Sequence, residues 1–392
     1  MTKLVLDPAA TLPKDGTAGT LVGRAWLPAV DGPAVVAVRD DGLHDISRSF
    51  PTMRDLAETR APAEAVAAAA GERIGTLAAV LANTPEDGRD QTKPWLLAPI
   101  DLQAIKAAGV TFAVSLLERV IEEQARGAPE RATAVRAQVE EALGGTVEDL
   151  VPGSPEAVGL KRLLQTQGLW SQYLEVGIGP DAEIFTKAPA MAAVGTGASI
   201  GVLAQSTWNN PEPEVVVVVN AAGAIVGATL GNDVNLRDLE GRSALLLGKS
   251  KDNNASTAVG PFIRLFDAAF SLDDVRRAEV RLTVEGSDGF RLEGSSAMAR
   301  ISRDPADLVA QMIGPHHQYP DGAVLFLGTM FAPVKDRDAP GHGFTHHGGD
   351  VVTIASDKLG ALVNVVTTCD RAPPWQFGAA ALMRNLAKRG LI

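Results

Sequence analysis

Short apolar runs separated by Gly-rich turns dominate the chain from about residue 180 onward. Residues 215–219 are five consecutive valines, and residues 225–230 form a second apolar run after a turn at 221–223. Apolar runs of this length that end at turn residues are typical of strands, and a short connection between two of them predicts a hairpin. Two further hairpins are predicted at 280–292 and at 351–365. We therefore expect an antiparallel or mixed β region rather than alternating βαβ units.

The first 97 residues have a different pattern. The Val-rich run at 34–38 predicts a short strand, and the Ala-rich stretch at 62–83 predicts a helix because Leu77, Val80 and Leu81 lie on one stripe. Another apolar strand is expected after Trp95. We expect a small N-terminal α/β domain over residues 1–97, followed by a larger domain over residues 98–392.

A helical insertion is predicted within the larger domain, at about residues 115–176. Apolar residues recur at helical spacing from Leu116 to Ile121, a charged run at 131–143 continues the pattern, and residues 155–173 predict a further helix. Two interpretations are open. The helices either cover the main sheet as a surface pair, or they form a lid over an active site.

Composition excludes several classes of protein. The chain has 392 residues, with 36 Lys and Arg against 47 Asp and Glu, and a net charge of −11. This acidity argues against a nucleic-acid partner and against binding to anionic membranes. A single cysteine rules out a disulfide scaffold and a cysteine-based zinc site. Since no apolar run approaches membrane-spanning length and the N-terminus lacks a signal-peptide core, we expect a soluble, cytoplasmic protein.

Three carboxylates in the β region predict a metal site. Glu212 and Glu214 open the valine strand on the same face, and Asp233 ends the next strand. If the two strands pair, all three carboxylates meet at one end. Oxygen ligands without His or Cys favour a hard ion, Mg²⁺ or Mn²⁺. The alternative is a solvated strand end with an Asp in a turn.

These residues also carry a resemblance. Several segments in the correct order, between about residues 98 and 370, resemble the fumarylacetoacetate hydrolase family. They are Ile184-Phe185-Thr186-Lys187-Ala188-Pro189, Glu212-Pro213-Glu214, Gly231-Asn232-Asp233-Val234, Gly248-Lys249-Ser250-Lys251-Asp252, Val259-Gly260-Pro261, Gly328-Thr329 and Gly349-Asp350-Val351-Val352. The resemblance implies an α+β fold with a mixed β-roll catalytic domain, and a homodimer or homotetramer. It also implies that Glu212, Glu214 and Asp233 hold Mg²⁺, with Mn²⁺ as a possible substitute.

One departure from the family narrows the activity. Family members that cleave C–C bonds carry a His-x-x-Glu pair, whereas here Ser115 stands in the place of the His and Glu118 is kept. Without the imidazole there is no evident base for a hydrolytic water. The chain looks most like the branch of dehydratases that convert 2-keto-3-deoxy-pentonates, derived from D-xylonate or arabinonate, to 2-oxoglutarate semialdehyde. A C–C hydrolase (acylpyruvase), an oxaloacetate decarboxylase and a non-catalytic binding protein are the alternatives.

The expected reaction needs a base, a cation and substrate ligands. A metal-bound 2-oxo acid has acidified C3 protons, and Glu183 is the first candidate for the base that removes one, with Glu118 second. Lys249 is the candidate that counters enolate charge, and Lys251 is a lesser one. Ser115, Thr329 and Lys187 are candidates for binding the small anionic sugar-acid substrate, although Lys187 could instead pair with the carboxylate cluster.

Four further features are expected to be structural. The pairs His316-His317 and His346-His347 lie in loop-like sequence without the helical spacing of a zinc site. Cys369 has no nearby base and is expected to be a packed thiol. Arg237 and Asp238 are expected to form a local ion pair.

Overall fold

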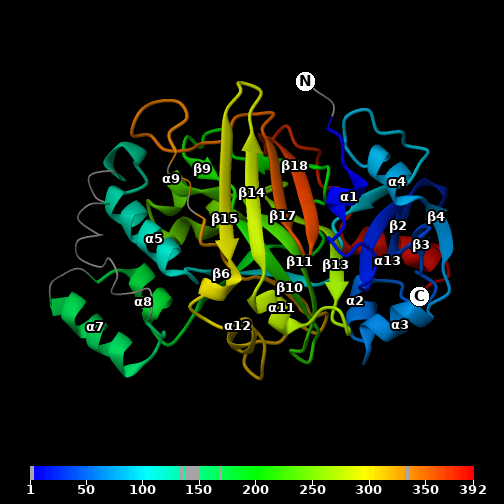
Figure 1. Cartoon of the computed structure of the whole chain (residues 1–392), viewed down its shortest axis with the longest axis horizontal. Helices are drawn as coiled ribbons and strands as arrows, with labels where there is room; N and C mark the ends of the chain where they lie inside the picture. Colours follow the sequence, from blue (N-terminus) through cyan, green and yellow to red (C-terminus); the bar gives the residue numbers. More distant parts are fainter. Residues whose placement is uncertain (1–3, 133–135, 137–149, 167–169, 332, 334) are drawn as a thin grey trace.

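Two β-sheets pack face to face between a group of helices at one end and the N-terminal residues at the other (Figure 1). The computed structural model describes residues 4–132, 136, 150–166, 170–331, 333 and 335–392. Within these ranges no helix combines the length and the apolar character needed to cross a membrane.

The larger sheet has eleven strands among the described residues. Their order is β4-β3-β2-β1-β13-β11-β10-β16-β6-β7, with β5 beside β1, and most neighbours are antiparallel whereas β16 and β6 are parallel. The strands are β1 (Leu21–Leu27), β2 (Gly32–Arg39), β3 (Gly42–Asp45), β4 (Glu72–Gly75), β5 (Trp95–Leu97), β6 (Ala104–Gly109), β7 (Glu183–Ala188), β10 (Pro213–Val219), β11 (Ile225–Asp233), β13 (Thr257–Leu265) and β16 (Ala323–Phe326).

The smaller sheet has the order β15-β14-β17-β18-β8, and β9 and β12 form a separate pair. These strands are β8 (Ser199–Val202), β9 (Asn209–Asn210), β12 (Asn235–Leu236), β14 (Glu279–Glu285), β15 (Arg291–Ala297), β17 (Val351–Ser356) and β18 (Gly360–Thr368). The three predicted hairpins are confirmed, because β10 pairs with β11, β14 with β15, and β17 with β18, each antiparallel.

The helices lie around the two sheets. They are α1 (Pro8–Thr11), α2 (Met53–Ala57), α3 (Pro62–Ala68), α4 (Leu77–Asn83), α5 (Ala113–Ala125), α7 (Pro155–Thr166), α8 (Gln172–Ile178), α9 (Arg237–Glu240), α10 (Leu247–Lys251), α11 (Leu272–Arg276), α12 (Pro305–Met312) and α13 (Ala379–Lys388). Single 3₁₀ turns are η1 (Pro28–Val30), η2 (Ala244–Leu246) and η3 (Met298–Arg300).

Strand β10 explains why an all-valine run is tolerated in the middle of the chain. Alternate side chains point to opposite faces, so Val215 and Val217 pack toward the smaller sheet, where Leu282 of β14 lies. Val216 and Val218 pack in a second core on the opposite face. A strand that is buried on both faces loses the polar alternation of a surface strand, and each face contributes to a separate core.

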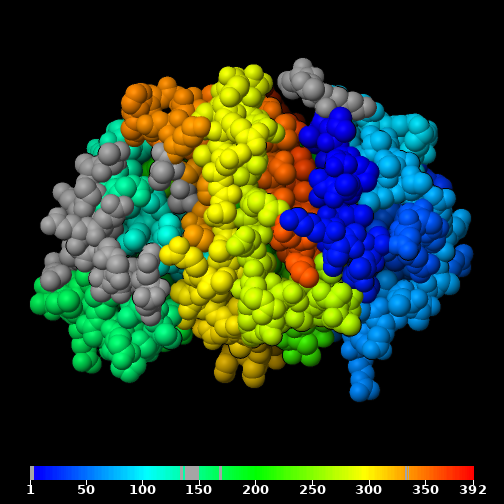
Figure 2. All heavy atoms as spheres, in the orientation of Figure 1, coloured from blue at the N-terminus to red at the C-terminus, as the bar shows by residue number. Residues whose placement is uncertain are grey.

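The N-terminal residues extend the larger sheet. Strand β1 pairs with β13, with Leu21 opposite Arg264 and Val22 opposite Ile263. The guanidinium of Arg264 is buried and donates to Asp15 at 2.6 and 2.8 Å. Figure 2 shows the N-terminal residues packed beside the residues of β17 and β18. The domain boundary near residue 97 stays a prediction, within a sheet that continues across it.

One sequence-based prediction of a long helix is wrong. Residues 62–83 form two helices, α3 and α4, which are separated by the edge strand β4. Gly71 allows a close approach to β3, since a Cβ there would lie 3.0 Å from side-chain atoms of His44 and Ile46. Backbone pairing of β4 with β3 therefore overrides the helical propensity of the Ala-rich sequence.

The predicted helical insertion contains α5, α7 and α8. The sequence predicts a helical run at 131–143 that stops at Gly144-Gly145. Of this run, residues 133–135 and 137–143 lie outside the described residues, and so does the Gly144-Gly145 stop. The predicted helix at 155–173 is two helices, because Ser171 is extended and its hydroxyl accepts from the Leu174 N–H as the N-cap of α8. These helices lie together at one end of the molecule (Figure 1).

Candidate metal centre

The β10–β11 hairpin brings the three predicted ligand carboxylates to one end of the larger sheet. Glu214 lies opposite Gly231, and the N–H of Asp233 donates to the carbonyl oxygen of Glu212 at 3.1 Å. Since alternate residues share a face, Glu212 and Glu214 point the same way. One carboxylate oxygen from each of the three lies within 4.8 Å of the others, and all three residues are buried. We call Glu212, Glu214 and Asp233 the carboxylate triad.

Two buried lysines contact the carboxylate triad. Lys251, at the end of α10, places Nζ 2.7 Å from Glu212 Oε2 and 3.1 Å from Asp233 Oδ2. Lys187 of β7 is fully buried, with Nζ 3.0 Å from Asp233 Oδ1 and 2.6 Å from the carbonyl oxygen of Lys251. Lys187 thereby ties one triad member to the backbone of the other lysine.

A main-chain donor fixes the third triad member. The N–H of Gly328 donates to Glu214 Oε2 at 2.6 Å. Gly328 has φ +86°, and a Cβ at this position would lie 2.0 Å from the hydroxyl oxygen of Thr111. Only glycine meets both demands, so this residue is required for the loop that carries Thr329 into the site.

A cavity of about 30 Å³ lies next to the carboxylate triad. It is lined by Ala108, Gly109, Val110, Ser115, Arg119, Glu183, Phe185, Glu212, Glu214, Asp233, Glu240, Lys251, Gly328 and Thr329. The cavity therefore joins β6, β7, α5, α9, α10 and the loop after β16, which are segments far apart in the sequence.

Glu183 enters the cavity from β7. It is opposite Gly109 of β6, where a Cβ would lie 2.1 Å from Glu183 Oε2. Glycine at 109 therefore leaves the space that the carboxyl group occupies. Burial raises the pKa of Glu183, although the positive charges of Arg119 and Lys251 oppose this shift.

Arg119 of α5 contacts three carboxylates. Its Nη2 donates to Glu212 Oε1 at 2.8 Å, and its Nη1 donates to Glu122 Oε2 at 2.8 Å. Nη1 also lies 2.9 Å from Glu240 Oε2. Burial disfavours the charge of Arg119, yet these three carboxylates raise its pKa well above the ordinary value. Arg119 is the link between the triad and helix α5.

The charges of the triad are unevenly stabilised. Burial, followed by the negative charges of Asp233 and Glu212, raises the pKa of Glu214 well above its ordinary value. Burial also favours a higher pKa for Asp233, but Lys187 and Lys251 outweigh burial and lower the pKa of that carboxyl group. The two lysines thus pair with Glu212 and Asp233, and no cation of the described residues forms an ion pair with Glu214.

A second buried cluster lies behind Arg119. Arg237 donates to Glu122 Oε1 at 2.6 Å and to Glu118 Oε2 at 3.0 Å, and Arg136 pairs with both oxygens of Glu118. We call Glu118, Glu122, Arg136 and Arg237 the α5–α9 network. The expected pair of Arg237 with Asp238 is wrong, because Asp238 instead accepts from Ser206 Oγ and the Thr207 N–H.

The structure brings most of the predicted site residues together. Six predicted residues line the cavity beside Glu183: the triad, Ser115, Thr329 and Lys251. Lys187 reaches the triad through Asp233 but is not among the lining residues. Glu118 belongs to the α5–α9 network. Lys249 is exposed, whereas Lys251 is buried, because residues two apart on the short helix α10 point to opposite sides.

Two lining residues were not predicted from the sequence. Arg119 follows Ser115 by four residues, so both lie on one face of α5. Glu240 follows Arg237 by three residues at the end of α9. Helical spacing from a chosen residue could have suggested both, but only the tertiary contacts of α5 and α9 bring them to one cavity.

The remaining predicted features lie outside the cavity. His346 is buried, with Nδ1 3.3 Å from Asp350 Oδ2, and burial lowers its pKa. His316 and His317 are in an exposed turn. Cys369 is partly buried, and burial raises its pKa to about 11, which makes it a poor nucleophile.

Among the described residues, the charges around the cavity fit a divalent cation. Five carboxylates (Glu183, Glu240 and the triad) face three cations (Arg119, Lys187 and Lys251), an excess of two negative charges. The α5–α9 network is balanced, with two carboxylates and two guanidinium groups. A 2+ ion held by the triad would compensate this excess and supply Glu214 with the cation that it lacks. Oxygen-only donors suit Mg²⁺ and similar hard ions.

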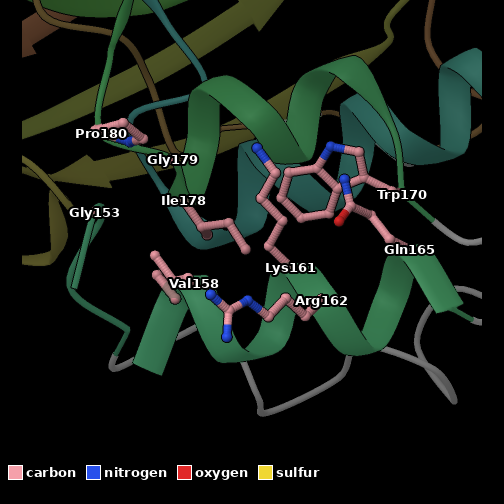
Figure 3. Close-up of a pocket in the computed structure, with 10 residues that line it drawn as sticks. Gly153, Val158, Lys161, Arg162, Gln165, Trp170, Ile178, Gly179 and Pro180 are labelled. Carbon is pink, nitrogen blue, oxygen red and sulfur yellow. The ribbon is translucent and has the colours of Figure 1, made fainter. Parts of the chain in front are cut away.

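A larger cavity, of about 250 Å³, lies between α7 and α8 (Figure 3). Trp170, Val158 and Ile178 line it, and Lys161 lies over the Trp170 ring while pairing with Glu175. None of the described residues that line it carries a carboxylate. It therefore lacks the metal-binding chemistry of the smaller cavity.

Comparisons with known proteins agree with this geometry. Residues 165–367 match the model of the fumarylacetoacetate (FAA) hydrolase C-terminal family. The chain is 31% identical over 196 residues to a probable 2-keto-3-deoxyxylonate dehydratase of Haloferax volcanii, and 33% identical over 187 residues to a 2-dehydro-3-deoxy-D-arabinonate dehydratase of Saccharolobus solfataricus. The matches cover 50% and 47% of this chain, and 64% and 58% of those relatives' lengths.

Solved structures show the same fold. A 2-keto-3-deoxy-D-arabinonate dehydratase complexed with magnesium and 2,5-dioxopentanoate is similar with a TM-score of 0.60, at 21% identity over 89% of this chain and 99% of that chain. The apo form of such an enzyme has a TM-score of 0.61 at 22% identity, with the same coverage. These likenesses confirm the expected mixed fold of helices and β-sheets.

Proposed function

The chain belongs to the fumarylacetoacetate hydrolase family, and we propose that it is a Mg²⁺-dependent dehydratase of a 2-keto-3-deoxy-pentonate that yields 2-oxoglutarate semialdehyde. The observation that carries this proposal is the composition of the cavity. A carboxylate triad and a separate buried carboxyl group, Glu183, line it, and none of the described residues that line it is a histidine. The names of the two curated relatives support the same substrate class.

The carboxylate triad would hold the ion. A bound hard cation polarises the keto oxygen of a 2-oxo acid and acidifies its C3 protons. Lys187 and Lys251 keep Asp233 ionised, Arg119 pairs with Glu212, and the Gly328 N–H orients Glu214. These contacts pre-organise the oxygen ligands before the ion binds.

Glu183 is proposed as the base that removes the C3 proton. It lies in the cavity but outside the triad, so its carboxyl group is not needed as a ligand. Its raised pKa brings it closer to neutrality, where a general base works best. Glu118 pairs with two arginines in the α5–α9 network, which argues against its use as the base.

Lys251 is proposed to stabilise the negative charge that develops on the substrate. Its ammonium group contacts Glu212 and Asp233 and lies within the lining of the cavity. Burial opposes the ammonium charge, but the surrounding carboxylates raise the pKa of Lys251, so it is fully charged at neutral pH. Ser115 and Thr329 add hydroxyl groups that suit a polyhydroxy acid.

Helix α5 is proposed to move when substrate enters. The cavity of about 30 Å³ holds an ion with a water molecule but not a five-carbon acid. Ser115 and Arg119 form the α5 wall, which supports the interpretation of this helix as part of a lid. Helix α7 does not contribute to the lining.

A coupled assay tests the proposed function. Purified protein with Mg²⁺ and 2-keto-3-deoxy-D-xylonate or the arabinonate isomer is expected to release 2-oxoglutarate semialdehyde, detected through an aldehyde dehydrogenase. Glu214→Gln is the matched control for metal dependence. Turnover of acylpyruvates or oxaloacetate, with none of either pentonate, would favour the hydrolase or decarboxylase activity instead.

A further inference from the structure

Glu240 is the cavity carboxyl group to which the proposed function gives no task. It ends α9, its side chain is 5% exposed, and it lines the cavity with Glu183 and Lys251. It is outside the carboxylate triad, and no contact joins it to a triad member. A buried carboxyl oxygen that accepts no hydrogen bond is costly, and such groups are common beside reacting centres.

The hydrogen bonds of Arg119 go to other carboxylates. Arg119 donates well-aligned bonds of 2.8 Å to Glu122 and to Glu212. Glu240 Oε2 is 2.9 Å from the guanidinium, yet no N–H of any described residue is aligned with it. The guanidinium thus stabilises its two other neighbours and leaves this oxygen of Glu240 without a hydrogen bond.

The other groups around Glu240 also favour its neutral form. Glu122 and Glu212 add negative charge, and the Tyr173 hydroxyl lies 3.5 Å from the Glu240 carbonyl oxygen rather than at its carboxyl group. Burial, only partly offset by Arg119 and Lys251, raises the pKa of Glu240 to about 7. Protonation of this carboxyl group near neutral pH therefore costs little free energy.

The charge balance of the described cavity requires one proton when substrate binds. Its excess of two negative charges matches one divalent ion. A 2-oxo acid brings one further negative charge into the same enclosed space. Because a buried unpaired charge is strongly unfavourable, one carboxyl group outside the triad should become protonated. Glu183 must stay ionised to act as a base, which leaves Glu240.

We propose that Glu240 takes up a proton when the anionic 2-oxo acid binds, and donates it to the C4 hydroxyl group as that group leaves. The inference rests on the proposed function and adds the general acid to it. It assigns different steps to two carboxyl groups, with Glu183 acting at C3 and Glu240 at C4.

The elimination step balances with these two groups alone. Glu183 takes the C3 proton, and the electron pair of that C–H bond becomes the C3–C4 double bond as the C4–O bond breaks. The departing oxygen takes the electron pair of that bond and the proton of Glu240, and leaves as water. Glu183 ends protonated and Glu240 ionised, so the net charge of the cavity is unchanged and no oxidant or reductant is needed.

The first experiment separates the two steps in the Mg²⁺-loaded enzyme. Deuterium exchange into the methyl group of pyruvate, followed by NMR in D₂O, reports proton removal at C3 without any leaving group. We expect Glu240→Gln to keep this exchange within about threefold while dehydration of the pentonate falls about a hundredfold or more. Glu183→Gln is expected to lose both activities.

The second experiment measures the proton itself. Titration calorimetry of pyruvate binding in two buffers of different ionisation enthalpy, at about pH 8, gives the number of protons taken up. We expect close to one proton for the unmodified enzyme and close to none for Glu240→Gln. Glu123→Gln, a change on α5 outside the cavity, is the matched control and should keep full uptake and turnover.

The outcomes distinguish this inference from the proposed function. An unmodified enzyme that neither exchanges pyruvate nor dehydrates either pentonate would contradict the proposed function. If it does both, but Glu240→Gln dehydrates within tenfold of it or still takes up a proton, the role of Glu240 is overturned. Melting curves and Mn²⁺ titration check that the variant is folded and binds metal, and retained pyruvate exchange shows directly that the site is intact.

Discussion

Two buried charge clusters are linked by Arg119, and they differ in their charge balance. The α5–α9 network has equal numbers of carboxylates and guanidinium groups, joined by direct hydrogen bonds. The cavity of the carboxylate triad has two more carboxylates than cations, and burial raises the pKa of Glu214. A charge-balanced cluster needs no ligand, whereas an unbalanced one is complete only with a cation.

Burial of charge does not by itself identify a functional site. Glu118 and Glu214 are about equally buried, at 6% and 3% exposed, and both are carboxylates on regular elements. What separates them is the partner: Glu118 has two guanidinium groups, and Glu214 has a backbone N–H. Counting partners around each carboxyl group is therefore more informative than burial alone.

Removing a triad charge should reduce activity more than any other change proposed for this site. Glu214→Gln should lower dehydration by about a thousandfold or more, because the ion loses a ligand and the substrate loses its electrophile. Calorimetry with Mn²⁺ should show weaker metal binding. The melting temperature without metal should not fall, since the change removes a repelled charge. A variant that binds metal and turns over normally would remove Glu214 from the site.

Breaking the balanced cluster should instead affect folding. Arg237→Ala leaves Glu118 with one partner fewer and Glu122 with only Arg119, both still buried. Loss of one partner of a buried ion pair costs about 3–5 kcal/mol, measurable by urea unfolding. Arg291→Ala, which removes two exposed ion pairs, is the control and should cost under about 1 kcal/mol. Equal losses in the free energy of unfolding for Arg237→Ala and Arg291→Ala would contradict the assignment of the α5–α9 network as a stabilising buried cluster.

A smaller effect distinguishes two lysines on one helix. Lys251→Met should reduce turnover about a hundredfold, because it removes the ammonium group from the cavity. Lys249→Met, on the exposed side of α10, should stay within about twofold, as is usual for surface changes. Steady-state kinetics at saturating Mg²⁺ measure the turnover of both variants. The reverse result would restore Lys249 as the cation of the site.

A weaker effect is predicted for the pH dependence of the folding stability of the metal-free protein. The folded state raises the pKa of Glu214, so folding favours the protonated carboxyl group and stability falls as the pH rises above about 4.5. Glu122 has a lowered pKa, since Arg237 and Arg119 outweigh its burial, and its contribution falls as the pH decreases.

Thermal melts of Glu214→Gln and of the unmodified protein, both in chelator, test whether the ionised Glu214 carboxyl group lowers stability as the pH rises. The variant should melt higher near neutral pH, and the difference should shrink toward about pH 4 and on addition of Mg²⁺. A difference that grows as the pH is lowered would contradict the assignment of Glu214 as an uncompensated buried carboxyl group.

Local patterns in the sequence were enough for the triad. The alternation of β10 and the short connection to β11 predict that Glu212, Glu214 and Asp233 meet, and the hairpin register confirms this. The three hairpins follow from the same patterns. These features depend on contacts between neighbours in the chain, which strand periodicity encodes directly.

Other features depend on contacts that local patterns do not encode. Whether Lys249 or Lys251 is buried depends on how α10 packs against β7, and the sequence of five residues does not specify that orientation. Arg119 and Glu240 lie on α5 and α9, two helices that the Arg237–Glu122 ion pair joins. The split of the helix at 62–83 depends on pairing with β3, about thirty residues away.

The pairing of β1 with β13 also constrains the order of folding. Leu21 and Val22 find their partners more than 240 residues later, and the Asp15–Arg264 contact spans a similar distance. Contacts of such high sequence separation slow folding, because a long loop must close before they form. During synthesis, the first strands would therefore emerge long before the strand that completes their sheet. They are then the segment most dependent on chaperones, or on rapid completion of the chain, to avoid pairing with other molecules.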